Sequence, residues 1–394
     1  MSPFPGGLAR ARTLLAERFG HAAFRVSQLK VLGPLLAGRS VLAVLPTGAG
    51  KSLCYQLPAL MSPGLTLVIS PLISLMQDQV AALRRRGIAA AYLNSLLGRD
   101  ERRAVLSATL AGSLTLLYVA PERLGALVGQ LTRGGRAVSL LAVDEAHCIV
   151  EWGNEFRPVY RRLDRYRYLL RDPVTIALTG SATPAARAEI LRVLRIPGAE
   201  VVVTSFDRPN LAFCVERVAD DRARFARIRE LIRGVAGAVV VYTPTRRLTE
   251  LVTRALLRMG IRAAPYHAGL GAATRRAVLR AFLADRAPVI VATSAFGMGI
   301  DKADVRRVLH WGPSRTLEAY YQEAGRAGRD GRPAECVVVW RPADFEWGDT
   351  ATAMRRYVET RACRRGALLA YFGERRARCS GCDVCGLAGD RPST

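Results

Sequence analysis

Apolar runs bounded by turn residues recur through the first half of the chain. They cover residues 41–45, 65–69, 115–119, 140–143 and 175–178, and the stretches between them are long enough for helices. Short continuous apolar runs are typical of strands buried on both faces, as in a parallel sheet covered by helices. The pattern therefore predicts an α/β unit.

A second series with the same rhythm follows at residues 238–242, 288–292, 305–310 and 336–340. Two series favour two tandem α/β units with parallel sheets. We expect the linker between them at residues 196–210, where Pro197, Gly198 and Pro209 interrupt the pattern.

Beyond residue 340 the strand pattern stops, and an arginine-rich stretch compatible with helices leads to a cluster of cysteines. We therefore expect three parts, namely residues 1–204, 205–342 and 343–394, of which the last is a small helical module.

Composition supports folded cores, because half of the 394 residues are hydrophobic. No apolar run approaches the roughly 18 residues that a membrane span needs. Residues 1–12 carry no secretory signal. We expect a soluble, cytoplasmic protein with no membrane partner.

The charge balance suggests a partner. Basic residues outnumber acidic ones 58 to 33, and the formal net charge is +25. Only Lys30, Lys51 and Lys302 are lysines, and a GC-rich coding bias explains the preference for arginine. That bias does not explain the excess of basic over acidic residues, so the composition favours a polyanion such as a nucleic acid.

A candidate phosphate loop follows the first apolar run and precedes a helix-compatible stretch. It consists of Thr47, Gly48, Ala49, Gly50, Lys51 and Ser52. Such glycines let backbone N–H groups approach phosphates, the lysine neutralises charge, and the serine hydroxyl can ligate Mg²⁺. Leu45 replaces the usual first glycine, so the loop needs support from elsewhere in the chain.

Asp144 and Glu145 give that support, because they end the apolar run at residues 140–143. The carboxyl ends of strands in such sheets are where ligands bind. We expect Asp144 to hold Mg²⁺ and Glu145 to take a proton from the attacking water. The alternative, two solvated acids in a turn, seldom follows a buried strand.

Arg326 and Arg329 lie three residues apart in the second unit, a spacing that places them on one helical face. Arginines so placed can stabilise the charge of a transferring phosphate. Alone, the pair fits an exposed basic helix equally well. With a phosphate loop in the first unit, the pair predicts a site completed by closure of the two units. The state of the bound ATP would then set the distance between two nucleic-acid-binding sites, one on each unit.

Trp152, Phe156 and Arg157 follow the acidic pair. Rings of this kind can stack on bases, and an arginine can bind a phosphate. Polar residues and Gly153 interrupt the aromatic pattern. The interruption indicates an exposed loop rather than a core helix.

Four of the eight cysteines cluster near the end of the chain, as Cys363, Cys379, Cys382 and Cys385. Their C-x15-C-x2-C-x2-C spacing can close a tetrahedral thiolate cage around Zn²⁺ with no open position. We therefore expect a structural zinc site. Nearby arginines are expected to add a basic surface for a phosphate backbone: Arg355, Arg356, Arg364, Arg365, Arg375, Arg376 and Arg378.

Taken in order, these motifs resemble the RecQ family of superfamily 2 helicases. The resemblance spans nearly the whole chain and is carried by FG at 19–20, FR at 24–25, Gln28, GAGKSLCYQL at 48–57, SPLISLM at 70–76, DEAHC at 144–148, FDRPN at 206–210, YHAGL at 266–270, FGMGID at 296–301 and YYQEAGRAGRDG at 320–331. It implies an α/β fold of two tandem RecA-like parallel-sheet domains plus a small helical zinc-binding module.

The resemblance also implies residue roles. Arg25 and Gln28 would recognise adenine, and His21 stands where a ring or alkyl chain usually stacks on the base. His147 joins the catalytic residues. Further ATP contacts fall on Asp301 and Gln322, and nucleic-acid contacts on Ser70, Pro71, Trp152, Phe156, Arg157, His267 and Thr293.

Three departures from the family pattern concern coupling between DNA and hydrolysis. The segment containing Trp152 and Phe156 would sense single-stranded DNA, but Glu151 stands where a glutamine is usual and Asn154 where a histidine is. Thr179-Gly180-Ser181-Ala182 replaces the usual TATA, a change that keeps the hydroxyls. We expect weakened or retuned coupling.

Nine residues follow Cys385. We therefore expect the winged-helix domain and the further C-terminal DNA-binding domain common in the family to be absent. Strand separation would then be weak, or would depend on the zinc module and a partner.

These inferences predict a monomeric ATP-dependent 3′→5′ DNA helicase of the bacterial nucleoid, with ATP, Mg²⁺ and Zn²⁺ as cofactors. Its partners would be single-stranded and tailed duplex DNA, in recombination and repair. Two alternatives remain open: an RNA helicase or translocase with little unwinding, because the preference for one sugar cannot be read from these residues, and a nucleotide-switched DNA-binding or annealing protein. Occupation of every catalytic position argues against the last.

Overall fold

A computed structural model describes residues 3–46, 48–151, 159–297, 302–345, 352–375, 378–379 and 381–386, without the side chain of Glu151. The chain forms two compact units, Met1–Ser205 and Phe206–Thr394. Across these described ranges, no helix combines the length and apolar character that crossing a membrane requires. Several residues expected in the site lie outside the description: Thr47, Trp152, Phe156, Arg157 and Asp301.

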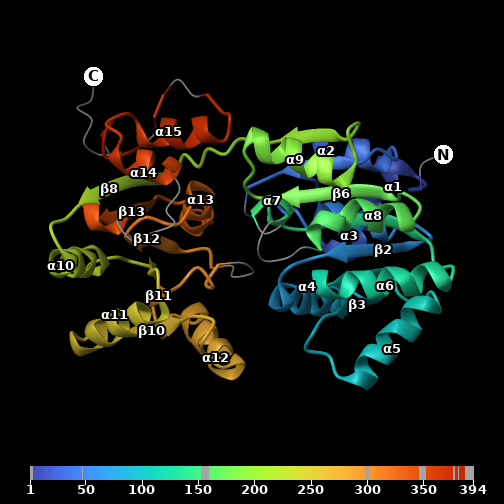
Figure 1. Cartoon of the computed structure of the whole chain (residues 1–394), viewed down its shortest axis with the longest axis horizontal. Helices are drawn as coiled ribbons and strands as arrows, with labels where there is room; N and C mark the ends of the chain where they lie inside the picture. Colours follow the sequence, from blue (N-terminus) through green and yellow to red (C-terminus); the bar gives the residue numbers. More distant parts are fainter. Residues whose placement is uncertain are drawn as a thin grey trace. The chain divides into compact units, whose positions relative to one another are not determined.

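The first unit is built on a seven-stranded parallel sheet with the strand order β3-β4-β2-β5-β6-β1-β7 (Figure 1). The strands are β1 (Val41–Val44), β2 (Leu65–Ile69), β3 (Ala90–Leu93), β4 (Leu116–Val119), β5 (Val138–Val143), β6 (Val174–Thr179) and β7 (Glu200–Val203). Because every pair in the register is parallel, all carboxyl ends lie at one edge of the sheet.

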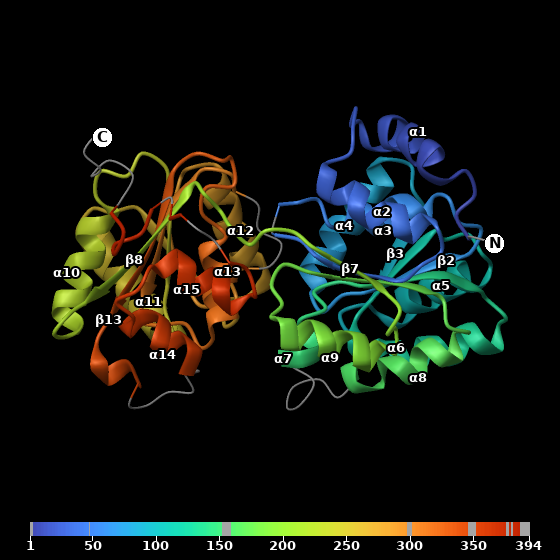
Figure 2. The same ribbon diagram turned by 90° about the horizontal axis from the view of Figure 1, so that it is seen from above.

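Helices cover both faces of this sheet. They are α1 (Gly7–Phe19), α2 (Val26–Leu36), α3 (Leu53–Ala59), α4 (Ile73–Arg85), α5 (Arg99–Leu110), α6 (Pro121–Arg133), α7 (Cys148–Glu151), α8 (Leu163–Leu169) and α9 (Pro184–Leu194), with a short 3₁₀ turn, η1 (Tyr160–Arg162). Figure 2 shows α1 to α4 on one side and α6 to α9 on the other. The first group buries Leu32, Tyr55 and Val80 against Ala142 and Leu178 of the sheet.

The second unit contains a six-stranded parallel sheet in the order β10-β11-β9-β12-β13-β8. Its strands are β8 (Leu211–Arg217), β9 (Ala238–Tyr242), β10 (Ala263–Tyr266), β11 (Val289–Ala292), β12 (Val305–Trp311) and β13 (Ala334–Trp340). Its helices are α10 (Asp221–Ile232), α11 (Arg246–Arg258), α12 (Ala272–Leu283), α13 (Leu317–Ala324), α14 (Thr352–Glu359) and α15 (Arg364–Tyr371), with a 3₁₀ turn, η2 (Pro342–Phe345). One core joins α10 and α11 to the sheet through Ile228, Leu256 and Val241.

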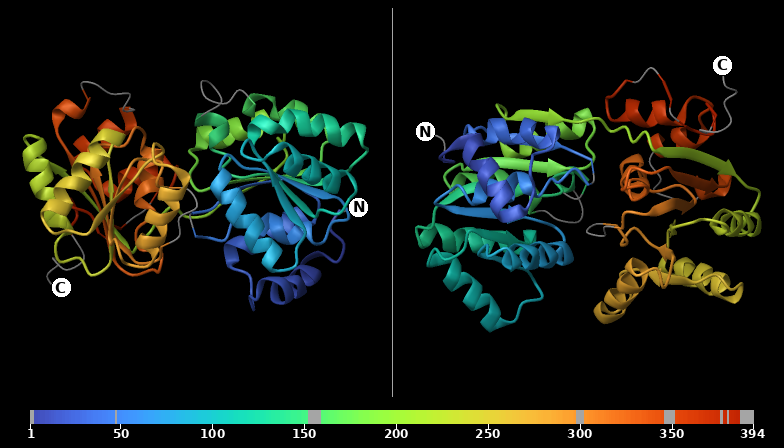
Figure 3. Two further views of the ribbon diagram at one scale, coloured as in Figure 1. Left: turned by 90° about the horizontal axis from the view of Figure 1, so that it is seen from below. Right: turned by 180° about the vertical axis from the view of Figure 1, so that it is seen from behind.

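The cysteine-containing module packs on β8, the edge strand of the second sheet (Figure 3). Cys382 forms a parallel β-bridge with Phe213, and the Asp383 N–H donates to the Phe213 carbonyl at 3.1 Å. Phe372 of the module stacks on Phe206, with ring centroids 4.6 Å apart. The module is therefore part of the second compact unit.

The predicted α/β class and the two parallel sheets are confirmed, and each expected apolar run is a strand. Four strands were not expected: β3, β7, β8 and β10, which occupy the four sheet edges. The predicted linker at residues 196–210 was partly wrong, because β7 pairs with β1 from within it. The connection is shorter, since β7 ends at Val203 and the second unit begins at Phe206.

Candidate nucleotide site and metal centre

The phosphate loop leaves the carboxyl end of β1 and enters α3. Gly48 has φ +84° and Gly50 has φ +77°, values that side chains rarely adopt. The Lys51 ammonium donates to the Leu45 carbonyl at 3.2 Å. Leu45 stands where the usual pattern has a glycine. Its side chain is fully buried in the core, so it does not prevent the Leu45 carbonyl from accepting the hydrogen bond of Lys51.

The start of α2 contacts this loop. The Arg25 guanidinium donates to the Gly48 carbonyl, and Gln28 Nε2 donates to the Gly50 carbonyl at 3.3 Å. Gln28 also accepts from the Arg25 backbone N–H at 2.9 Å through Oε1. The structure thus brings Arg25, Gln28 and the glycines together, while His21 is exposed just beyond α1.

The acidic pair follows β5 at the same sheet edge, since β5, β6 and β1 are neighbouring strands. Asp144 is 4% exposed. Burial and the adjacent Glu145 carboxylate raise the pKa of Asp144 to about 7, against the lowering effect of the Lys51 ammonium. A buried carboxylate next to a second, partly exposed carboxylate is a fitting site for a divalent cation.

Glu145 and His147 form a connected group. Glu145 adopts φ +50°, a conformation uncommon outside glycine and often found at functional sites. Its carboxylate lies 3.3 Å from His147 Nδ1, which is also 3.0 Å from the Thr179 hydroxyl at the end of β6. The Thr179 hydroxyl in turn donates to the Ser181 carbonyl at 3.1 Å. The acidic pair is therefore connected to the segment that replaces TATA.

In the second unit, Arg326 and Arg329 lie in the loop after α13, not on one helical face as expected, because α13 ends at Ala324. Arg326 is 9% exposed, and its side chain hydrogen-bonds the Tyr242 hydroxyl. That hydroxyl donates to the Phe296 carbonyl at 2.6 Å. Arg326 thus contacts Tyr242 at the end of β9, which is bonded to the segment after β11, while Gln322 lies on α13.

Sequence reasoning missed Arg208 and Asn210, which bond the backbone of this arginine loop. Arg208 donates to the Ala327 carbonyl at 3.1 Å and to the Gly328 carbonyl at 2.9 Å. Asn210 donates to the Gly328 carbonyl at 2.8 Å. The residues belong to the FDRPN motif, which marked the segment but carried no assigned role.

The described residues that were expected to contact nucleic acid follow strands in both units. Ser70 and Pro71 are buried after β2 in the first unit. In the second unit, the Thr293 N–H donates to the Tyr266 carbonyl at 3.2 Å, so Thr293 and His267 follow neighbouring strands. His267 Nε2 lies 2.9 Å from the Glu250 carboxylate.

The four clustered cysteines converge. One sulfur from each of Cys363, Cys379, Cys382 and Cys385 lies within 4.8 Å of the others, and the Cys363 and Cys382 sulfurs are 4.0 Å apart. Tetrahedral zinc with Zn–S bonds near 2.3 Å requires sulfurs about 3.8 Å apart. Burial opposes ionisation of Cys382, but backbone N–H groups of Cys385 and Arg364 help to lower its thiol pKa to about 7. The cluster fits a zinc ion.

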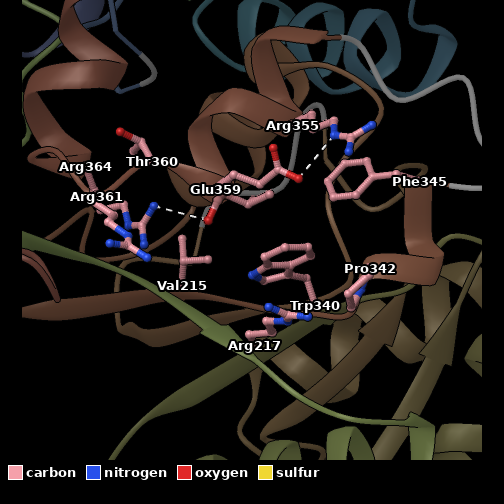
Figure 4. Close-up of a pocket in the computed structure, with 11 residues that line it drawn as sticks. Val215, Arg217, Trp340, Pro342, Phe345, Arg355, Glu359, Thr360, Arg361 and Arg364 are labelled. Carbon is pink, nitrogen blue, oxygen red and sulfur yellow. Dashed lines mark hydrogen bonds and ion pairs between the residues drawn. The ribbon is translucent and has the colours of Figure 1, made fainter.

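The arginines near the cluster differ in their exposure to solvent. Arg364 and Arg365 are buried and form ion pairs with Asp383 and Asp207, so their expected place on a basic surface was wrong. Arg356, Arg375 and Arg378 are exposed, and Arg376 lies outside the described residues. Arg355 lines a pocket of about 490 Å³ beside α14. Figure 4 shows this pocket, where Arg355 pairs with Glu359 at 3.1 Å and Arg217 lies against Trp340.

Three family models match the chain. A DEAD/DEAH box helicase model covers residues 25–191, a helicase conserved C-terminal domain model covers residues 223–331, and a RecQ zinc-binding model covers residues 348–386. With the two parallel sheets, the phosphate loop and the DEAH sequence, these matches define a two-domain protein of the DEAD/DEAH box helicase class.

Relatives narrow the class to a family. The chain is 41% identical over 409 residues to the ATP-dependent DNA helicase RecQ of Bacillus subtilis, covering 98% of this chain and 68% of that protein. It is 40% identical over 393 residues to the protein of the same name from Haemophilus influenzae, covering 95% of this chain and 63% of that protein. The chain belongs to the RecQ family.

Solved structures agree on the fold. Mycobacterium smegmatis helicase Lhr, solved with ssDNA and AMP-PNP, gives a TM-score of 0.65 at 23% identity, over 86% of this chain and 48% of that one. Saccharomyces cerevisiae Dbp5, solved with RNA and ADP BeF3, gives 0.68 at 16% identity, over 90% and 92% of the two chains. Both likenesses concern the two-sheet architecture.

A variant of the cysteine cluster tests the metal centre. Cys382→Ser is expected to bind no zinc and to melt at a lower temperature, because metal binding to such sites stabilises the fold. Metal analysis by mass spectrometry and thermal melting check both. Cys214→Ala, a buried cysteine of β8 outside the cluster, should retain zinc. Full zinc content in Cys382→Ser would contradict the site.

The glycines of the phosphate loop provide a matched pair. Gly48→Ala and Gly50→Ala both incur about 1–2 kcal/mol for a left-handed conformation. At Gly50 the added Cβ would also meet Gln28 Nε2, at 2.5 Å, whereas at Gly48 no atom of the described residues lies within 4 Å. Displacing Gln28 costs a further ~1 kcal/mol in lost hydrogen bonds. Urea unfolding should show Gly50→Ala as the less stable; equal stabilities would contradict the contact.

Proposed function

We propose that the protein is an ATP-dependent DNA helicase that hydrolyses ATP to translocate 3′→5′ on single-stranded DNA and to unwind duplexes in recombination and repair. The observation that carries the proposal is the convergence of Lys51 and Asp144, with Glu145 and His147, at the carboxyl edge of one parallel sheet. The names of the relatives at about 40% identity favour DNA over RNA as the substrate.

The first unit would bind the nucleotide. Lys51 and the loop N–H groups hold the phosphates, and Arg25 and Gln28 recognise the adenine as they do in the family. Mg²⁺, when bound by Ser52 and Asp144, supplies positive charge to the phosphates. Glu145 orients the attacking water and accepts its proton, and His147 couples that carboxylate to Thr179.

The second unit would complete the site. Arg326 and Arg329 supply cationic donors for the charge that develops on the transferring phosphate, when the two units close around ATP. Gln322 and Asp301 would make further contacts with ATP. Closure and reopening would move the nucleic-acid contacts of the two units relative to one another, and that motion is translocation.

Zinc would have a structural role, because four thiolates leave no position for water. Single-stranded DNA would contact Ser70 and Pro71 in the first unit, the segment containing Trp152, Phe156 and Arg157, and His267 and Thr293 in the second. The functional parts are residues 1–204, 205–342 and 343–394. We propose a monomer as the active form.

Two variants test the chemistry of hydrolysis. Lys51→Ala and Glu145→Gln are each expected to lower DNA-stimulated kcat by about 10²–10⁴-fold, because they remove phosphate neutralisation and proton acceptance. Single-stranded DNA affinity should stay within about twofold. A phosphate-release assay and fluorescence anisotropy measure the two quantities. Lys30→Ala and Glu122→Gln, both exposed, serve as controls; parental turnover in Lys51→Ala or Glu145→Gln would refute the assignment.

Tailed duplexes test direction and substrate together. With ATP and Mg²⁺, a DNA duplex with a 3′ single-stranded tail should be separated, and one with a 5′ tail should not. A 3′-tailed RNA duplex of the same sequence should be a poor substrate. Gel separation of the product strand reads out each case. DNA-stimulated hydrolysis without strand displacement on either DNA substrate would instead identify a translocase.

A further inference from the structure

The loop after α13 that carries Arg326 and Arg329, here the arginine loop, is held by Arg208, which belongs to neither the loop nor α13. The guanidinium of Arg208 donates to three carbonyls of the loop backbone: those of Gly325 at 3.4 Å, Ala327 at 3.1 Å and Gly328 at 2.9 Å. A planar guanidinium offers its donors in a fixed fork. Arg208 therefore fixes the path of the backbone that carries Arg326.

Asn210 holds the same loop from the next position. Its side-chain amide donates to the Gly328 carbonyl at 2.8 Å and to the Arg332 carbonyl at 2.9 Å. Gly328 has φ +53°, and a Cβ there would lie 2.8 Å from the Arg332 carbonyl oxygen. The loop is therefore closely confined between Asn210 and its own backbone.

Arg208 is in turn held by Arg365 of the cysteine-containing module. Arg365 is 1% exposed. Its guanidinium donates to the Asp207 carboxylate at 2.5 Å, to the Arg208 carbonyl at 2.8 Å and to the Leu211 carbonyl, and it lies 5.2 Å from the centre of the Phe213 ring. A buried cation with several fixed acceptors leaves this segment little freedom.

Arg365 is adjacent to two of the segments that carry the clustered cysteines. Cys363 caps α15, since its sulfur accepts from the Gly366 N–H at 3.3 Å, and Arg365 is two residues further on. On the other side, the Gly381 carbonyl accepts from Arg365 at 3.5 Å, and Gly381 precedes the ligand Cys382. Closing the cage therefore fixes both supports of Arg365.

We propose that residues 207–210 are a positioning element, which transmits the order of the cysteine cage to the loop carrying Arg326 and Arg329. The catalytic consequence rests on the proposed function of those two arginines. The mechanical coupling of the segment to the loop does not rest on it.

The test uses Arg208→Lys and Asp207→Asn in the full chain, with Arg222→Lys, an exposed arginine of α10, as matched control. Hydrogen–deuterium exchange of the peptide 323–333 should be at least about tenfold faster in both variants, with zinc content and exchange in the first unit unchanged. DNA-stimulated kcat should fall by about 10–100-fold, with the KM for ATP and the DNA affinity within about twofold.

The outcomes separate positioning from folding and from the proposed function. Unchanged loop exchange in both variants overturns the proposal, and so does faster exchange throughout the second unit with loss of zinc. If Arg208→Lys does not fold, Asn210→Ser should show the same local increase. Faster loop exchange in a protein whose parent hydrolyses no ATP sustains the positioning role and refutes only the proposed function.

Discussion

The parallel pairing of β1, β5 and β6 is the constraint on which the candidate site depends. Their hydrogen bonds continue past the strands: Leu45 N–H donates to the Thr179 carbonyl at 3.0 Å, and Ala146 N–H donates to the Leu178 carbonyl at 2.8 Å. A parallel ladder leaves all three carboxyl ends at one edge. Lys51, Asp144 and Thr179 are far apart in the sequence, and this pairing alone brings them together.

Burial then decides the chemistry of that edge. Asp144 lies on a fully buried strand end, and its carboxylate has lost most of its hydration. Such a group becomes neutral unless a cation replaces the water. Burial, with the neighbouring Glu145 carboxylate, raises the pKa of Asp144 for this reason. The fold holds an acidic pair in a place that becomes favourable when positive charge binds there.

The sequence predicted the interior strands of both sheets well and the four outermost strands poorly. Interior strands are covered on both faces and form continuous apolar runs, as in β9. Edge strands need not. β7 reads EVVV with three of its four residues exposed, and β10 contains Pro265, which only an edge tolerates well. Glu200 and Pro265 interrupt the apolar pattern in β7 and β10, and β7 lies within the segment predicted as a linker, whereas β3 and β8 contain apolar runs at residues 88–93 and 211–215 that were not among the predicted strands.

The same limit applies to the site. Lys51, Asp144 and the four cysteines belong to patterns whose side chains do the chemistry, so spacing alone suggested them. Arg208 and Asn210 act on backbone carbonyls. Every residue carries a carbonyl, so no sequence pattern identifies which ones will be bound. Residues of this kind become visible only when the loop they hold has coordinates.

The cysteine cluster packs on β8, an edge strand of the second sheet, close in sequence to the residues that hold the arginine loop. A module this small cannot bury enough apolar surface to be stable alone, and a metal cage is one common remedy. Packing on an exposed sheet edge is another: the module pairs with β8 through the bridge between Cys382 and Phe213, and its four cysteines could hold a metal. Since β8 begins directly after Asn210, whatever orders this edge also orders the residues that hold the arginine loop. The module thus contacts the core of the second unit, and Arg365 and Arg208 connect its cysteine segments to the backbone of the loop that carries Arg326.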